Sequence, residues 1–308
     1  MMNRQNSVIE VKDFTKTYKD FVAVDTISFE VWEGEIFGLL GPNGAGKTST
    51  LECLEGLRTP SGGSLRVAGL VPSSEFPKLK NVIGVQLQSS ALPENITPQE
   101  AVRLFSAYHG VEPRYELLDR LGLAEKRSSQ FFELSTGQQR RLSLALAVMH
   151  QPQVLFLDEP TAGLDVATRS VLHQMMKELQ AEGTTIILAT HDMAEAEELS
   201  DRVAILLKGR VEKIGTPLEI TAAGAGLTKI SVRTESSSLP LTVEAFPAVA
   251  HVVAREEYQV YFSTDIGSTV SALINHIEAS GDTLVDLRVE RPSLEDRFLE
   301  ITGTGEQA

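Results

Sequence analysis

Cysteine and long apolar runs are nearly absent from this sequence. Cys53 is the single cysteine among 308 residues, so the chain cannot form an internal disulfide. Its place in an apolar stretch after a glycine-rich loop favours a buried core thiol over a reactive one, and a disulfide-free chain fits a reducing compartment. No segment reaches the roughly 20 consecutive apolar residues that a membrane-spanning helix needs, and residues 1–11 lack the apolar core of a signal peptide. These absences predict a soluble, cytoplasmic protein that reaches a membrane only through a partner.

Positive charge is scarce as well. The 28 Lys and Arg residues are outnumbered by 42 Asp and Glu residues, for a net charge of −14, and no run of Lys and Arg forms a basic patch. An acidic chain repels nucleic-acid phosphates, so we expect no general nucleic-acid binding. The length of the chain and its 42% of hydrophobic residues are sufficient for two domains with cores of their own.

Short apolar runs alternate with longer amphipathic stretches over the first two thirds of the chain. Near-continuous apolar strands separated by helices are typical of a parallel sheet with helices on both faces. The sequence therefore predicts an α/β domain over residues 1–222, with two additional strands (8–14 and 27–31) at the edge of its sheet. Its buried strands are expected at residues 36–40, 82–87, 154–157, 185–189 and 203–207.

Residues 92–149 differ from the stretches on either side and read as a helical subdomain inserted between two strands. Thr97, Pro98 and Glu100 form a helix start, with a capping side chain, a proline in the first turn and a glutamate three residues after the cap. This helix is expected to end near His109. A second helix is expected over residues 113–121 and stops at Gly122.

The last third of the chain has the composition of a separate unit. Residues 222–226 (AAGAG) read as a linker, and residues 227–308 predict a small accessory domain of mixed helices and strands. Its strands are expected at 229–233, 258–263 and 283–290, and its helices at 268–279 and 292–301.

A phosphate-binding loop follows the strand at residues 36–40. The sequence GPNGAGKT matches the pattern G-x-x-x-x-G-K-[ST], and a stretch compatible with a helix comes next. The glycines let several backbone N–H groups converge on phosphate oxygens, and the helix adds its positive N-terminal end. Lys47 is expected to reach the β- and γ-phosphates, and the Thr48 hydroxyl to bind Mg²⁺. The residues predicted to contact the nucleotide here are Gly41, Pro42, Asn43, Gly44, Ala45, Gly46, Lys47, Thr48 and Ser49.

Two carboxylates end the strand at residues 154–157. Because a buried strand delivers Asp158 beside the phosphate loop, Asp158 is expected to hold Mg²⁺ through its water shell. Glu159, next in the chain, is placed to polarise the attacking water as a general base. The alternative is a pair of solvated charges at the end of a strand, which the nearby phosphate loop makes less favourable. The loop itself does not distinguish kinases, GTPases, helicases and transporters.

The sequence LSTGQ, which ends at Gln138, indicates which class of phosphate-loop protein this chain belongs to. It resembles the signature sequence of ABC ATPases, usually LSGGQ, with Thr136 in place of a glycine. The resemblance implies that Ser135, Thr136, Gly137 and Gln138 close over a nucleotide held by another subunit, so that two chains sandwich two ATP molecules head to tail. The alternative is a plain helix N-cap at Ser135.

Four further positions match that family in order, and their roles are those that the resemblance implies. Tyr18 falls where an aromatic ring stacks on adenine. Gln88 resembles the glutamine that touches Mg²⁺ and senses the membrane partner, with Gln86 as a competitor. Asp165 resembles the aspartate that acts across the dimer interface, although it also suits a helix cap. His191 resembles the switch histidine that contacts the γ-phosphate.

The tail sequence PSLEDRFL, residues 292–299, resembles the ending of ATPase subunits in ABC-2 type drug and antibiotic exporters of the daunorubicin-exporter group. The resemblance implies an ATPase (ATP and water to ADP and phosphate) that works as a homodimer at the inner face of the cell membrane. A separate multi-span permease would export a drug-like or lipid-like compound and would set the substrate, which this sequence does not reveal. The alternatives are a soluble ABC ATPase acting on nucleic acid or ribosomes and a small-molecule kinase with a phosphate loop.

Overall fold

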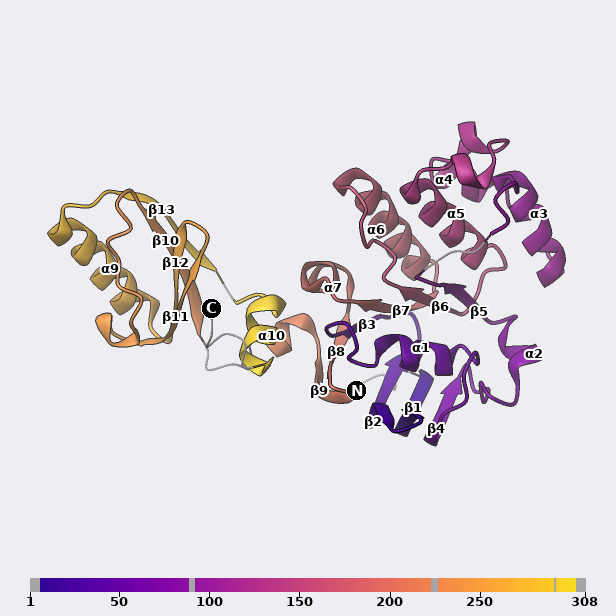
Figure 1. Cartoon of the computed structure of the whole chain (residues 1–308), viewed down its shortest axis with the longest axis horizontal. Coiled ribbons are helices and arrows are strands. Elements are labelled where there is room, and N and C mark those ends of the chain that lie inside the picture. The colour runs from indigo at the N-terminus through magenta and orange to yellow at the C-terminus, as the bar shows by residue number, and fades with distance from the viewer. Residues whose placement is uncertain (1–5, 89–91, 223–226, 291, 303–308) are drawn as a thin grey trace. The chain divides into compact units, whose positions relative to one another are not determined.

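The computed structural model describes residues 6–88, 92–222, 227–290 and 292–302. The chain forms two compact units, Met1–Ile214 and Gly215–Ala308 (Figure 1). The division lies ahead of residue 222, where the composition changes, because helix α8 (Pro217–Ala222) contacts helix α10 (Leu294–Thr302) within the second unit. Most of the expected linker, residues 223–226, lies outside the described residues. In the described part of the chain, no helix is long and apolar enough to cross a membrane.

A six-stranded sheet forms the centre of the first unit, in the order β5-β6-β7-β3-β8-β9. Its first five strands are parallel. Every residue of β3, β6 and β7 is buried, as expected for strands covered on both faces, and the predicted α/β class is confirmed. The strands are β5 (Ile83–Gln86), β6 (Val154–Asp158), β7 (Thr185–Thr190), β3 (Ile36–Leu40), β8 (Arg202–Leu207) and β9 (Arg210–Gly215).

A second, antiparallel sheet accompanies it, in the order β2-β1-β4. The expectation that residues 8–14 and 27–31 extend the edge of the parallel sheet is wrong. Residues 27–31 alternate buried and exposed side chains, the pattern of an antiparallel sheet with one solvated face. In residues 8–14 the alternation is broken where the register with β2 shifts between Val11 and Phe14. A tight turn at Lys19 joins the two segments as a hairpin. The strands are β1 (Ser7–Tyr18), β2 (Phe21–Trp32) and β4 (Gly62–Val67).

Helices cover both faces of the parallel sheet. The helical insert packs with the long helix α6 in one apolar cluster, and helix α1 packs between the two sheets in another. Cys53 lies fully buried in the second cluster, and burial raises the pKa of its thiol to about 11, so the prediction of an inert core thiol is confirmed. The helices are α1 (Lys47–Leu54), α2 (Phe76–Leu79), α3 (Pro98–His109), α4 (Glu116–Arg120), α5 (Thr136–Val148), α6 (Val166–Ala181) and α7 (Met193–Leu199).

The capping signals of the insert act as predicted. Thr97 and Glu100 form a reciprocal capping box at the start of α3. Ser135 and Gln138 form the same motif at the start of α5, so Ser135 is the N-cap of this helix. Helix α4 begins only at Glu116 and is shorter than residues 113–121.

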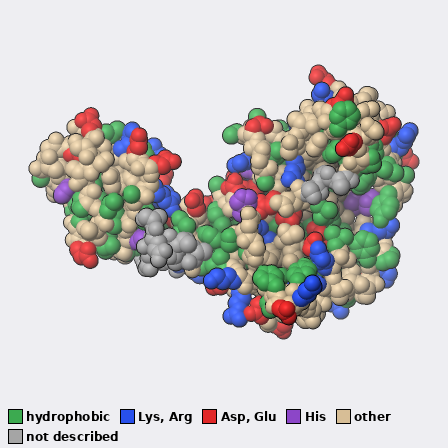
Figure 2. All heavy atoms as spheres, viewed as in Figure 1, with side chains coloured by type: hydrophobic (Ala, Val, Ile, Leu, Met, Phe, Trp, Pro, Cys, Tyr) green, Lys and Arg blue, Asp and Glu red, His purple; other side chains and the backbone are tan. Residues whose placement is uncertain are grey.

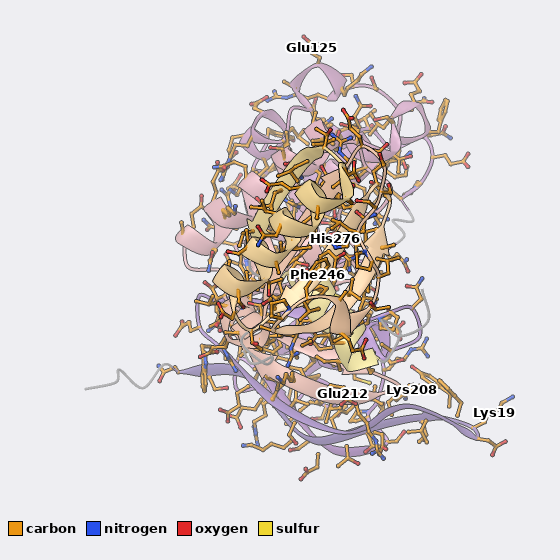
Figure 3. The ribbon with its side chains drawn as sticks, turned by 90° about the vertical axis from the view of Figure 1, so that its left-hand side faces the viewer. Lys19, Glu125, Lys208, Glu212, Phe246 and His276 are labelled. Carbon is orange, nitrogen blue, oxygen red and sulfur yellow. The ribbon has the colours of Figure 1, made fainter. Side chains whose placement is uncertain are left out.

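The second unit is a four-stranded antiparallel sheet, in the order β11-β12-β10-β13, with helix α9 packed on one face. Phe246 and His276, which lie beside one another in Figure 3, have ring centroids 5.5 Å apart and close the end of this core. Strand β11 was not predicted, because its run of residues does not alternate cleanly. The elements are β10 (Thr228–Thr234), β11 (Val249–Arg255), β12 (Tyr258–Ser263), α9 (Ile266–Ser280) and β13 (Leu284–Glu290).

Asp296 anchors helix α10 to this sheet. Its carboxylate accepts hydrogen bonds from the Ser293 backbone N–H and hydroxyl at 2.9 and 2.8 Å, which caps the helix. The same buried carboxylate lies 3.4 Å from Lys229 Nζ on β10 and 2.9 Å from Arg255 Nη2 on β11. The tail motif that resembles the exporter ending therefore has a structural role in this unit.

Replacing Asp296 with alanine is expected to destabilise the packing of α10 on the sheet by about 2–4 kcal/mol, because it removes the carboxylate half of the reciprocal cap with Ser293 and leaves two cations without their buried partner. Hydrogen exchange of the full chain measures this as faster exchange in α10 and β10. The matched control is Glu295→Ala, an exposed neighbour, which we expect to change exchange little. Equal protection in the two variants would contradict the anchoring role.

Candidate nucleotide-binding site

The phosphate loop turns tightly between β3 and α1. Gly46 has φ of 105°, and a Cβ atom there would lie 2.6 Å from the Ala23 carbonyl oxygen, so only glycine fits. The buried Lys47 side chain folds back over the loop and donates to the carbonyl oxygens of Gly41 at 2.6 Å and Pro42 at 3.3 Å. The loop thus holds a buried ammonium group at its centre.

Asp158, at the end of β6, lies beside the first turn of α1. Its Oδ2 accepts a hydrogen bond of 3.0 Å from the Thr48 hydroxyl. Its Oδ1 is buried and has no hydrogen-bond partner among the described residues. Burial raises the pKa of Asp158, because a carboxylate loses hydration there. An unpartnered buried carboxylate oxygen next to a hydroxyl is the donor set that a Mg²⁺ ion uses.

Glu159 lies between a lysine and a histidine. Its backbone has φ of 49°, a left-handed conformation that turns the chain sharply at the end of the strand. One carboxylate oxygen lies 3.5 Å from Lys47 Nζ, and the other accepts a 2.7 Å hydrogen bond from Nδ1 of the half-exposed His191. The carboxylate therefore lies beside the phosphate loop, where it can accept a proton.

A hollow of about 180 Å³ opens over the phosphate loop. The Tyr18 hydroxyl lies 3.3 Å from Ser49 Oγ on one side of it, and Lys16 and Arg58 place cations 5.0 and 5.3 Å from the centre of the Tyr18 ring. The hollow is lined by Tyr18, Phe21, Ala23, Pro42, Asn43, Gly44, Ala45, Gly46, Lys47, Thr48, Ser49, Gln88 and Glu159.

Two residues that line the hollow, Ala23 and Phe21, were not predicted from the sequence, and the aromatic one is Phe21. Its side chain is 61% exposed at the start of β2, although large apolar side chains normally avoid water. The signal that would have revealed it is the hairpin turn, which brings Phe21 opposite Tyr18. Two aromatic side chains therefore stand at the rim of the hollow.

The two candidate glutamines, Gln86 at the end of β5 and Gln88 just after it, face different surroundings. Gln88 is exposed and lines the hollow over the phosphate loop. Gln86 is 1% exposed and lines a different hollow, which is described below. The geometry favours Gln88 as the glutamine of the nucleotide site.

Eight predicted site residues are not among those that line the hollow. Gly41, Asp158 and His191 lie beside it, in contact with Lys47, Thr48 and Glu159. The other five lie at the starts of α5 and α6: Ser135, Thr136, Gly137, Gln138 and Asp165. Asp165 caps α6 through the Thr168 backbone N–H at 2.9 Å. A Cβ atom on Gly137 would lie 2.9 Å from the Thr168 side chain, so the starts of α5 and α6 are in close contact. These residues form a second cluster, which does not complete the nucleotide hollow of its own chain.

Comparisons with known proteins agree with this geometry. Residues 24–162 match the family model described as ABC transporter. The linearmycin resistance ATP-binding protein of Bacillus subtilis is 32% identical over 96% of this chain and 98% of its own length. The daunorubicin resistance ATP-binding protein of Streptomyces coeruleorubidus is also 32% identical, over 97% of this chain and 96% of its own. A dimeric ATP-binding cassette bound to ADP and phosphate is 26% identical, with a TM-score of 0.63 over 68% of this chain and 98% of that one.

Proposed function

Since the chain belongs to the ABC transporter family and hydrolyses ATP, we propose that the residues around the phosphate loop carry out the hydrolysis and power export through a separate membrane permease. The observation that carries the proposal is the position of Glu159, between Lys47 and His191 at the edge of the nucleotide hollow. Its role as general base is tested by the glutamine variant argued in the Discussion.

The hydrolysis follows from the contacts of these side chains. Lys47 exchanges its two carbonyl partners for the β- and γ-phosphates, which also releases one oxygen of Glu159. Glu159 then takes a proton from the attacking water, whose oxygen bonds to the γ-phosphorus while the bond to the ADP oxygen breaks. His191, held by Glu159, donates to the γ-phosphate as negative charge shifts between its oxygens.

Thr48 and Asp158 would hold the Mg²⁺ ion that accompanies ATP. The unpartnered Oδ1 of Asp158 and the Thr48 hydroxyl fit a hard cation, and Gln88 lines the same hollow. When bound, the ion neutralises charge on the β- and γ-phosphates. Thr48, Asp158 and Gln88 would supply the ligands of the ion, which leaves Glu159 available as the general base.

We propose that two copies of the chain complete two sites head to tail. The nucleotide hollow takes no lining from the signature residues of its own chain, while Ser135 and Thr136 are exposed at the start of α5. A helix N-terminus with exposed hydroxyl and N–H groups suits a phosphate that another subunit presents. The dimeric cassette bound to ADP and phosphate supports this arrangement. Asp165 would then lie at the interface.

The permease would dock on a second hollow of about 350 Å³, between β5 and helices α2, α3 and α5. Its walls are largely apolar and include the exposed Leu57, Leu87 and Tyr108. Both polar atoms of the Gln86 amide are buried there without a hydrogen-bond partner in the described chain. Figure 2 shows green apolar side chains gathered around purple histidine on this side of the larger unit. Apolar walls with an unpaired amide suit a polypeptide segment. Gln88, which lines the nucleotide hollow, directly follows Leu87, which lines this one.

Tyr108→Glu is expected to abolish co-purification with the permease, because a charge would be buried against an apolar partner. Tyr108 is 58% exposed, so the substitution leaves the fold intact, which an ATP-binding titration verifies. Val111→Glu is the control, since Val111 is exposed near the same helix but does not line this hollow. Normal recovery of the permease with Tyr108→Glu would show that the partner docks elsewhere.

The exported compound is proposed from the relatives alone. Two of them are resistance proteins, against linearmycin and daunorubicin, so we propose export of a drug-like or lipid-like compound. The permease would hold this chain as a peripheral subunit at the inner face of the cell membrane.

A further inference from the structure

Helices α6 and α7 are joined by a ladder of opposite charges. The basic side chains recur every fourth residue of α6 and the acidic ones every third residue along α7, so each set lies on one face of its helix. The outer pairs are Arg169 with Asp192 at 3.3 Å and Lys177 with Glu198 at 3.0 Å. The ladder consists of Arg169, His173 and Lys177 facing Asp192, Glu195 and Glu198.

The middle rung is a histidine between two carboxylates. Nε2 of His173 lies 3.3 Å from Glu195 Oε1, and its Nδ1 lies 3.2 Å from Glu198 Oε2. An ionised carboxylate only accepts hydrogen bonds, so when both carboxylates are ionised both ring nitrogens donate to them and the ring is a charged imidazolium. The side chain of His173 is only 8% exposed and that of Glu195 is fully buried. A charge pair in this setting is screened little by solvent.

Glu195 also links His173 to the turn that follows strand β6. Its Oε1 also accepts a 2.5 Å hydrogen bond from the hydroxyl of Thr161, two residues after Glu159. Helix α7 starts directly after His191 and Asp192, and α6 starts directly after Asp165. The contact therefore joins the middle of α6 and the first turn of α7 to the segment that carries Glu159.

We propose that His173 is a positioning residue for ATP hydrolysis, whose imidazolium holds α6 against α7 and thereby keeps His191 and Glu159 aligned when Asp165 meets the partner subunit. This inference rests on the proposed roles of these three residues. His173 itself lies outside the lining of the nucleotide hollow, so it acts through Glu195 and Thr161.

The contacts of His173 with Glu195 and Glu198 make ATP hydrolysis depend on pH. The groups facing His173 are Glu195 and Glu198 from α7, the uncharged Thr161, and Arg169 and Lys177 one turn away on its own helix. Its hydrogen bond to Glu195, followed by the charges of Glu195 and Glu198, raises the pKa of His173 against the opposing effect of burial. A raised pKa keeps the charged form present to a higher pH than in a free histidine, and that form is lost as the pH rises through the pKa of the folded state. Activity is therefore expected to fall on the alkaline side.

The test compares His173→Gln with His173→Lys in the full chain. His173→Gln is expected to lower kcat roughly 5- to 10-fold with KM for ATP changed less than about twofold, because ATP binding stays intact while alignment is lost. It also removes the alkaline fall in activity. His173→Lys retains a charge above the histidine pKa, so its activity is expected to stay level where wild type declines. Lys177→Gln, on the exposed outer rung, is the control and keeps the wild-type profile.

A wild-type kcat and an unchanged alkaline fall in His173→Gln would overturn the proposal. Circular dichroism and an ATP-binding titration establish that the variant is folded; if His173→Gln does not fold, the level pH profile of His173→Lys decides alone. Glu159→Gln is measured beside them. If Glu159→Gln is inactive and the His173 variants behave as wild type, only the positioning role fails; if Glu159→Gln remains active, the proposed catalytic roles fail first.

Discussion

Replacing Glu159 with glutamine is expected to lower the rate of ATP hydrolysis at least about a hundredfold, the usual contribution of a general base. The amide keeps the size of the side chain and its hydrogen-bonding contact with His191, but it cannot take a proton from water. ATP binding is expected to remain, because Lys47 and the phosphate loop are unchanged.

The same variant is expected to accumulate as a closed dimer with ATP, since the γ-phosphate that joins the two subunits is no longer removed. Size-exclusion chromatography with and without ATP measures this. Glu125→Gln, an exposed glutamate on the helical insert that Figure 3 labels, is the control and should turn over ATP and reopen. A Glu159→Gln protein that stays monomeric with ATP, while wild type hydrolyses it, would refute the role of Glu159.

Lys47→Ala is expected to weaken ATP binding about a hundredfold, which corresponds to about 2.7 kcal/mol. Lys47 is the buried ammonium group at the centre of the loop, and charge-assisted hydrogen bonds to phosphate are lost with it. Isothermal titration with ATP measures the change. The control is Lys19→Ala, at the tip of the neighbouring hairpin (Figure 3), which does not line the hollow. Unchanged affinity in Lys47→Ala would exclude this loop as the nucleotide site.

The sequence was most informative where one segment carries the whole signal. Strands β3, β6 and β7 are buried on both faces, so their apolar runs revealed both their positions and the parallel sheet. The phosphate loop and the capping box at Thr97 are equally local, since each depends on residues within one turn. These predictions needed no knowledge of the rest of the fold.

Pairings between distant segments could not be predicted from the sequence. The segments 8–14 and 27–31 were recognised as strands, but their sheet depends on pairing with β4, which lies far along the chain. Phe21 joined the site only because the hairpin brings it opposite Tyr18. His173 reads as an ordinary helix residue until α7 is known to lie against α6. Side-chain chemistry is visible in a sequence, whereas the partner that gives it a role is supplied by the fold.

The central claim, that this chain powers a separate membrane permease, is tested most directly by affinity purification of the tagged chain from detergent-solubilised host membranes, with every co-purifying protein identified. Recovery of a multi-span membrane protein in stoichiometric amount is the expected result. Recovery of the chain alone, or together with ribosomes or nucleic acid, would contradict it and would indicate a soluble ATPase of the same family.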